Sequence, residues 1–405
     1  MSFRGEWGVP DPALGLRLPI VQVEQITDAA SLEGLVRDAR EAGRFAIDTE
    51  FVWERTYAPR LCLVQIATPT RLAVVDPVAG APLDPIAALI ADPAIVKVMH
   101  APAADLTGFA LHFGVQPASV WDLQLAAGFA GLGGSLSLER ALEQAVGVRL
   151  RHAEGFTDWS KRPLTEVQIA YAADDVRHLL AAADALDERL RGLGRQAWAA
   201  EEMERRFGAG AQVVQDPDQA WRRVQGRGKL RPGQLATLVG LAAWREREAR
   251  RRNIPTSWLI RDATLVELAR RRPATAAEAE GVRGLQLKRG RQMDELLEVI
   301  RSGAGEEPDR VPEIPAELRN RVKVVLPLAS AVLQARCADA GIASELVATR
   351  DDLEATIRHA GGSGEPEPAL LSGWRRELAG EALLRLLSGQ VALRVVDGPP
   401  HVAEA

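Results

Sequence analysis

Near the start of the chain lies Arg44-Phe-Ala-Ile-Asp-Thr-Glu-Phe51, an apolar run interrupted by two acids. Its length and its apolar residues are typical of a β-strand. Because side chains alternate along a strand, Asp48 and Glu50 should project from one face while Ile47 and Thr49 project from the other. Two carboxylates on one strand face can chelate or bridge a metal ion. An edge strand with two solvated acids is the alternative that this stretch alone leaves open.

Strand-like and helix-like patterns alternate from about residue 20 to residue 207. The first three strands follow one another closely, which indicates an antiparallel arrangement. Thr165 is expected to cap the last long helix, because a threonine hydroxyl can accept from the free amides of a first turn. The pattern predicts a mixed sheet flanked by helices. The expected strands cover 45–51, 61–66, 71–76 and 96–100, and the expected helices cover 103–113, 136–146 and 165–190.

Two further acids lie in these expected helices, Asp105 at the start of one and Asp175 on one face of another. Asp105 lies in the first turn of the helix expected over 103–113, where a carboxylate is favoured by the helix dipole and capping alone could explain it. Tyr171 and Asp175 are four residues apart, so both should project from one face of the later helix. Asp122 is expected to be an N-cap, and Gln65 could bond a strand neighbour or a substrate.

The composition describes an ordinary soluble protein rather than a purely electrostatic nucleic-acid binder. The chain has 405 residues, 47% of them hydrophobic and 26% charged, with a net charge of −5. This length predicts two or three domains. Cys62 and Cys337 lack metal-ligand spacing and should be buried thiols in a reducing compartment. The absence of a signal-like or membrane-spanning stretch predicts a cytoplasmic protein.

Beyond residue 208 the pattern becomes helical. Several short helices are expected over 215–300, with Trp221 and Trp244 in the core, and 302–312 has the composition of a linker. Another helical unit should follow to about residue 396, and the last few residues should be disordered. Basic clusters in the first unit can be solvated helix faces or phosphate contacts. The residues selected as nucleic-acid contacts are Arg222, Arg223, Arg227, Lys229, Arg251 and Arg252.

Taken together, the motifs resemble the DEDDy 3′–5′ exonucleases, and more closely the ribonuclease D family. The signature is Asp-x-Glu in the first strand, an Asp opening a helix after a later strand, and Tyr-x-x-x-Asp on a late helix. The resemblance covers the whole catalytic region and continues into both helical units. The similar stretches are 45–51, 61–67, 121–127, 157–165 and 171–180, then 241–249 with 253–255, and finally 370–378.

The resemblance implies a ribonuclease H-like α/β exonuclease domain followed by two all-α domains of the helicase-and-RNase-D C-terminal (HRDC) type. The implied boundaries are 1–207, including an N-terminal extension to about residue 20, then 211–302 and 312–396. Asp48, Glu50, Asp105 and Asp175 would hold two divalent cations, Mg²⁺ or Mn²⁺, and Tyr171 would orient the attacking water. Nucleoside 5′-monophosphates would leave one at a time from the 3′ end of tRNA precursors or other small structured RNAs.

Two other functions stay open on the residues alone. A single-stranded DNA exonuclease would need the same carboxylates, since only contacts to the 2′-hydroxyl separate the two polymers. A non-catalytic RNA-binding scaffold would be indicated by loss of any of the four acids, but all four are present. No feature of the sequence indicates an oligomer, so a monomer is expected.

Overall fold

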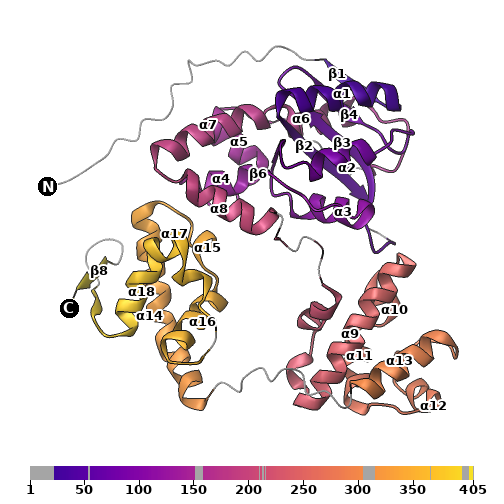
Figure 1. Cartoon of the computed structure of the whole chain (residues 1–405), viewed down its shortest axis with the longest axis vertical. Helices are drawn as coiled ribbons and strands as arrows, with labels where there is room; N and C mark the ends of the chain where they lie inside the picture. Colours follow the sequence, from indigo (N-terminus) through magenta and orange to yellow (C-terminus); the bar gives the residue numbers. More distant parts are fainter. Residues whose placement is uncertain are drawn as a thin grey trace.

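The computed structural model describes residues 22–52, 55–150, 158–208, 210, 211, 214, 216–303, 315–364, 366–394 and 401–404. An α/β part is followed by two helical units that lie at different places around it (Figure 1). In the described ranges, no helix is both long and apolar enough to cross a bilayer. The predicted N-terminal extension and most of the predicted linker at 302–312 lie outside these ranges.

Six strands form one mixed sheet in the order β1-β4-β3-β2-β5-β6. The central strand β2 pairs antiparallel with β3 and parallel with β5. β3 and β4 are also antiparallel, which confirms the arrangement predicted for the first three segments. The strands are β1 (Val23–Ile26), β2 (Arg44–Val52), β3 (Arg60–Ala67), β4 (Leu72–Val75), β5 (Val96–Met99) and β6 (Val120–Asp122).

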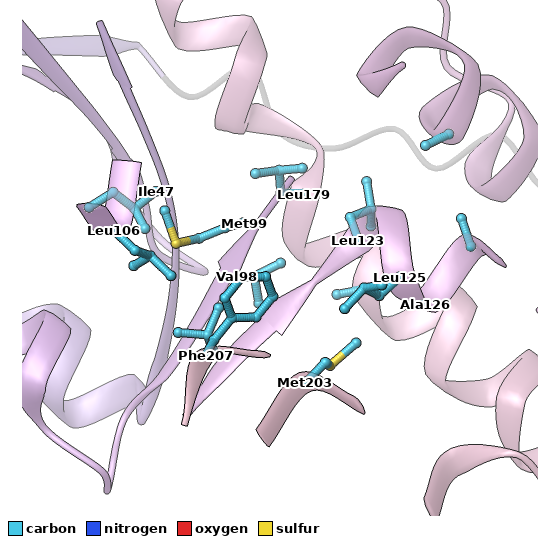
Figure 2. Close-up of a cluster of buried hydrophobic side chains, with 14 of the residues drawn as sticks. Ile47, Val98, Met99, Leu106, Leu123, Leu125, Ala126, Leu179, Met203 and Phe207 are labelled. Carbon is cyan, nitrogen blue, oxygen red and sulfur yellow. The ribbon is translucent and has the colours of Figure 1, made fainter. Parts of the chain in front are cut away.

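Eight helices accompany this sheet in the described part of the α/β region. One of them, α6, packs across β2, β3 and β4. On the other side, Ile47 of β2 joins a buried apolar cluster with Leu106, Leu179 and Phe207 (Figure 2). The helices are α1 (Ala29–Ala42), α2 (Asp84–Ala91), α3 (Ala103–Phe113), α4 (Leu123–Phe129), α5 (Leu138–Val146), α6 (Glu166–Arg177), α7 (Leu179–Gly192) and α8 (Gln196–Phe207).

The first helical unit has a core of its own, separate from the core around the sheet. It touches the α/β part through Tyr57, which lies between β2 and β3. Its hydroxyl lies 2.5 Å from Glu246 Oε1, and Arg250 Nε donates to it at 2.7 Å. After 3₁₀ turns at Pro217–Arg223 and Arg227–Lys229, the helices are α9 (Pro232–Arg252), α10 (Thr256–Leu259), α11 (Asp262–Arg271), α12 (Ala276–Glu280) and α13 (Arg291–Ser302).

The second helical unit shares a continuous apolar core with the α/β part. The Trp374 ring meets Phe129 edge-on at 5.0 Å and stacks on Trp198 at 5.6 Å. Its helices are α14 (Ala316–Ala340), α15 (Ser344–Val347), α16 (Arg350–Ala360), α17 (Gly373–Arg375) and α18 (Glu381–Leu387), with a 3₁₀ turn at Ala369–Leu371 and a π-helical turn at Arg376–Gly380; the hairpin strands β7 (Val391–Arg394) and β8 (His401–Glu404) follow.

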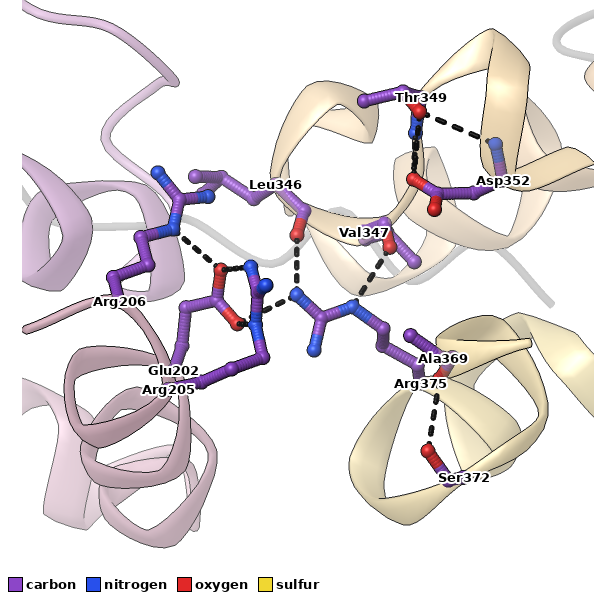
Figure 3. Close-up of polar contacts among 10 residues, drawn as sticks. All are labelled: Glu202, Arg205, Arg206, Leu346, Val347, Thr349, Asp352, Ala369, Ser372 and Arg375. Atoms are coloured by element: carbon purple, nitrogen blue, oxygen red, sulfur yellow. Dashed lines mark hydrogen bonds and ion pairs between the residues drawn. The ribbon is translucent and has the colours of Figure 1, made fainter. Parts of the chain in front are cut away.

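A buried ion-pair network crosses this second contact (Figure 3). Arg375 Nη2 lies 2.6 Å from Glu202 Oε2, and Arg205 and Arg206 bond the same carboxylate. Glu202 is fully buried. Burial alone would raise the pKa of Glu202, but the hydrogen bonds from Arg205, Arg375 and Arg206 outweigh it and lower the pKa to about 2.

Several elements differ from the sequence predictions. The helix expected over 165–190 is two helices, α6 and α7, which are separated at His178. β1 was not predicted, and Trp221 lies in a 3₁₀ turn rather than an α-helix. The final residues are not all disordered, since 401–404 pair with β7. The capping roles of Thr165 and Asp122 are confirmed, as is the burial of both free cysteines.

We expect Glu202→Gln to lower the free energy of unfolding by about 3–5 kcal/mol, because it leaves the buried Arg375 guanidinium without its counter-ion. Since the pKa of Glu202 is lowered, its stabilisation is complete above pH 4.5 and is lost as the pH falls toward about 2. Urea unfolding followed by tryptophan fluorescence measures both effects. The control Glu188→Gln breaks only an exposed pair with Arg191 and should cost at most about 1 kcal/mol. Equal losses in the two variants would contradict this account.

Candidate active site

The strand β2 supplies the first two carboxylates. Asp48 lies opposite Gln65 of β3 and Glu50 lies opposite Leu63, so both acids occupy one face of the strand pair. The register shifts directly after Glu50. Such irregularities bend a strand and re-aim its side chains, and they are frequent beside active sites. Ile47 is buried in the apolar cluster on the opposite face, which confirms the predicted alternation.

The first turn of α3 brings Asp105 to the edge of β2. β5 pairs with β2 only from Arg44 to Ala46, so the later part of that edge is open to the helix. The Thr49 hydroxyl donates to Asp105 Oδ1. The helix can lie this close because residue 108 is glycine: a Cβ there would come within 2.7 Å of the Phe51 ring.

The helix α6 carries the remaining two predicted site residues. Asp175 raises the pKa values of Tyr171, Glu50 and Asp48, so its carboxylate lies within electrostatic reach of all three. The neighbouring Asp174 is bonded instead by Arg177, at 2.7 Å. Asp175, which the four-residue spacing from Tyr171 favours, is therefore the member of the Asp-Asp pair that interacts electrostatically with the other acids, and its role as a ligand stays a prediction.

The Tyr171 ring is held by the segment that precedes α6. It stacks on Trp159, with ring centroids 6.2 Å apart, and Trp159 is itself only 6% exposed. Arg162 fixes this segment to the sheet: its guanidinium forms two 2.6 Å bonds to Asp76 and others to the carbonyls of Trp159 and Cys62. The tyrosine, 36% exposed, thus lies on a rigid support with its ring partly open to solvent.

Burial raises the pKa of every one of the four carboxyl groups, and repulsion from other members of the set adds to the shift for Asp48 and Glu50. For Asp48 the shift is upward and large, because burial is reinforced by Asp105, Asp175 and Glu50. Burial, with Asp175 and Asp105, raises the pKa of Glu50 to about 8. Burial also raises the pKa of Asp105 to about 6 and, with Asp174, that of Asp175 to about 7. Asp175 and burial, with Glu50 and Asp48, raise the pKa of Tyr171 to about 12. Such a set is stable as carboxylates only when positive charge is supplied.

The donor chemistry fits hard divalent cations, because all four groups offer carboxylate oxygens. Within the described ranges, however, no three His, Cys, Asp or Glu side chains already form a coordination set. The four acids are thus in electrostatic contact without a closed cage. Exonucleases of this fold family use divalent metal ions.

A cavity of about 870 Å³ lies elsewhere. Its lining includes Tyr57, His112 and Arg250, and none of the four acids or Tyr171 contributes to it. His112 and Asn253 there already bond the backbone at Pro59 and Ala58. The carboxylates, rather than the volume of the cavity, therefore mark the site of the chemistry.

The six basic residues selected as nucleic-acid contacts are all exposed on the first helical unit. Arg251 makes two bonds to Glu248, and Arg223 lies 3.6 Å from Glu246, so part of this positive charge is neutralised within the protein. Arg222 lies over the Trp221 ring at 5.0 Å. A contact of these side chains with nucleic acid stays a prediction.

Sequence reasoning missed three residues that shape the site. Thr49 was expected only to face away from the acids, yet its hydroxyl bonds Asp105. Trp159 and Arg162 lie in the quoted 157–165 stretch. Trp159 contacts Tyr171 in the next helix, and Arg162 bonds Asp76, which is 86 residues away in sequence. An aromatic residue and an arginine just before the tyrosine helix were the available signals.

The chain is similar to known proteins along most of its length. Residues 23–191, which contain all four acids and Tyr171, match a 3′–5′ exonuclease family, and residues 234–300 match the HRDC domain. Ribonuclease D of Gluconacetobacter diazotrophicus is 36% identical, with 98% of each chain covered. Ribonuclease D of Granulibacter bethesdensis is 37% identical, over 92% of this chain and 94% of that protein.

A solved structure of a ribonuclease D has a fold similar to that of this chain. Escherichia coli RNase D, described as an exoribonuclease involved in structured RNA processing, superposes with a TM-score of 0.75. The two are 31% identical, and the match covers 91% of this chain and 99% of that one. Similarity of this extent, which includes the sheet and both helical units, indicates common ancestry. The chain belongs to the ribonuclease D family.

Proposed function

We propose that this chain is a metal-dependent 3′–5′ exoribonuclease that releases nucleoside 5′-monophosphates from RNA 3′ ends. The observation that carries the proposal is the gathering of Asp48, Glu50, Asp105 and Asp175 from three elements, at the cost of raised pKa values in all four. Repulsion among the acids lowers the stability of the folded protein, so their clustering needs another explanation. Such clustering is useful where cations and a phosphodiester must meet.

The residues divide the work as follows. Asp48 is central, since each of the other three acids raises its pKa, and it would help to hold two divalent cations, Mg²⁺ or Mn²⁺. Glu50, Asp105 and Asp175 would complete the sites. When bound, the cations would offset negative charge on the reacting phosphate and the leaving 3′ oxygen. The Tyr171 hydroxyl, held by Trp159, would orient the attacking water.

RNA is proposed as the polymer because of the family, and small structured RNAs such as tRNA precursors are proposed as its substrates. The basic face of the first helical unit would supply affinity through phosphate contacts that the acidic site does not offer. We further propose a monomer that acts in the cytoplasm.

The direct test is digestion of RNA and DNA oligomers labelled at the 3′ or the 5′ end, with Mn²⁺ or with EDTA. We expect labelled mononucleotide at once from the 3′-labelled RNA, a ladder from the 5′-labelled RNA, and no reaction with EDTA. Faster digestion of DNA would favour the single-strand DNA exonuclease. Binding of RNA without any hydrolysis would favour the scaffold.

Asp48→Asn should lower turnover by at least about 10³-fold, because it removes the carboxylate on which the other three converge. The fold should persist, since the substitution also relieves repulsion. Turnover of a 3′-labelled RNA and thermal unfolding are the measurements. The matched control is Asp174→Asn, one residue from Asp175 but paired with Arg177, which should retain nearly full turnover. Full activity of Asp48→Asn would remove the assignment.

Tyr171→Phe should lower kcat by about 10²-fold or more while Mn²⁺ binding is unchanged, because the ring that stacks on Trp159 stays and only the hydroxyl is lost. The chain has two tyrosines, so Tyr57→Phe is a natural control. That variant loses a hydroxyl bonded to Glu246 and Arg250, and kcat should hardly change. Equal kcat in wild type and Tyr171→Phe would exclude the hydroxyl from the reaction.

Arg252→Ala should raise KM for RNA while leaving kcat unchanged, because the loss of a phosphate contact weakens binding without altering the reacting groups. The dependence of log affinity on log salt concentration should become shallower by about 1. Arg350→Ala, which removes the same charge from α16 in the second helical unit, is the control. If both variants bind RNA alike, the basic face of the first unit is not the contact surface.

A further inference from the structure

Gln65 of β3 is a buried polar side chain that the site as described does not use. Its exposure is 0%, and neither its amide nitrogen nor its amide oxygen has a hydrogen-bond partner. Buried polar groups are nearly always paired, because leaving one unpaired costs its full desolvation. An unpaired amide at the centre of a sheet therefore calls for an explanation.

The register of the sheet says what Gln65 can reach. Asp48 lies directly opposite it on β2, and Val74 lies directly opposite on β4. Directly paired residues project from the same face, and their Cβ atoms lie about 4.5–5.5 Å apart. Along β3 itself, the neighbours on that face are Leu63 and Ala67. Of these four side chains, only that of Asp48 is polar.

The chemistry of the pair is complementary. An amide N–H donates to a carboxylate, and such charge-assisted bonds are among the stronger ones in proteins. Carboxylates that ligate metals are commonly held from behind by a second residue, which fixes their orientation. Gln65 has the reach and the donor for this task. Because Gln65 is fully buried, its amide is not accessible to a polynucleotide in this structure, and of the two roles that the sequence left open its burial favours the bond to a strand neighbour.

We propose that Gln65 is a positioning residue that donates its amide N–H to Asp48 and orients that carboxylate for the divalent cations. The inference rests on the proposed metal-dependent function, which it extends to one specific residue outside the acidic set. In the metal-loaded protein the amide nitrogen is paired. In the metal-free protein the amide nitrogen of Gln65 is unpaired, which lowers the stability of the fold.

Titration of the full-length chain with Mn²⁺ alone, by calorimetry, tests this role. Gln65→Met keeps the length of the side chain but removes the amide, and it should weaken Mn²⁺ binding by about 10–100-fold. The same variant should unfold no earlier than wild type without metal, because an unpaired polar group is gone. The control Gln234→Met removes an amide that accepts from the Arg231 backbone in the first helical unit, and Mn²⁺ binding should be unchanged.

The outcomes separate the two claims. Failure of the wild-type chain to bind Mn²⁺ would remove the metal-dependent function itself. Wild-type binding with undiminished affinity in Gln65→Met would overturn the role of Gln65 alone, as would an early loss of the metal-free fold with unchanged affinity. Should the variant not fold, a crystal structure of the wild-type chain with Mn²⁺ decides: Gln65 Nε2 within hydrogen-bond distance of Asp48 supports the proposal, and any other partner refutes it.

Discussion

Repulsion among four carboxylates, one of them buried and three half-buried, determines how the sheet and the helices around it must be built. Asp48 and Glu50 are fixed by the register of β2, Asp105 by the first turn of α3, and Asp175 by α6. No one of these elements could hold the set together, since each charge disfavours the next. The sheet and the two helices must be rigid enough that the acids cannot relax apart, and the continuous apolar core beneath them supplies that rigidity.

The two helical units stand in different relations to this rigid core. The second shares its apolar interior and is joined to it by the Glu202–Arg375 network, so it is structurally part of the catalytic body. The first has a separate core and meets the α/β part through polar contacts around Tyr57. Polar contacts of this kind are easier to break and re-form than a shared core. If one unit moves relative to the sheet, it is therefore the first, which carries the six basic residues selected as nucleic-acid contacts.

The sequence was sufficient where the pattern is local. Alternation along 45–51 placed Asp48 and Glu50 on one face of β2, and the four-residue spacing placed Tyr171 and Asp175 on one helix, α6. It was insufficient where partners are set by tertiary packing. Glu202 and Arg375 are 173 residues apart, and the sequence around either residue does not predict their ion pair. The break between α6 and α7 at His178 was missed because the helical periodicity of the sequence continues through it. The hairpin of β7 and β8 was missed because it is stabilised by pairing between the two strands, which neither strand's sequence indicates.

Gln65 shows why local pattern and tertiary context must be read together. In sequence it is one polar residue in an apolar strand, and such a residue is ambiguous between an exposed position and a functional one. The structure removes the first option, since the side chain is fully buried. Among the neighbours that the register places beside it on the same face of the sheet, only Asp48 is polar. If this position had no functional role, an apolar residue would make the strand more stable than a buried, unpaired amide does. The amide opposite Asp48 is therefore explained by its proposed bond to that carboxylate.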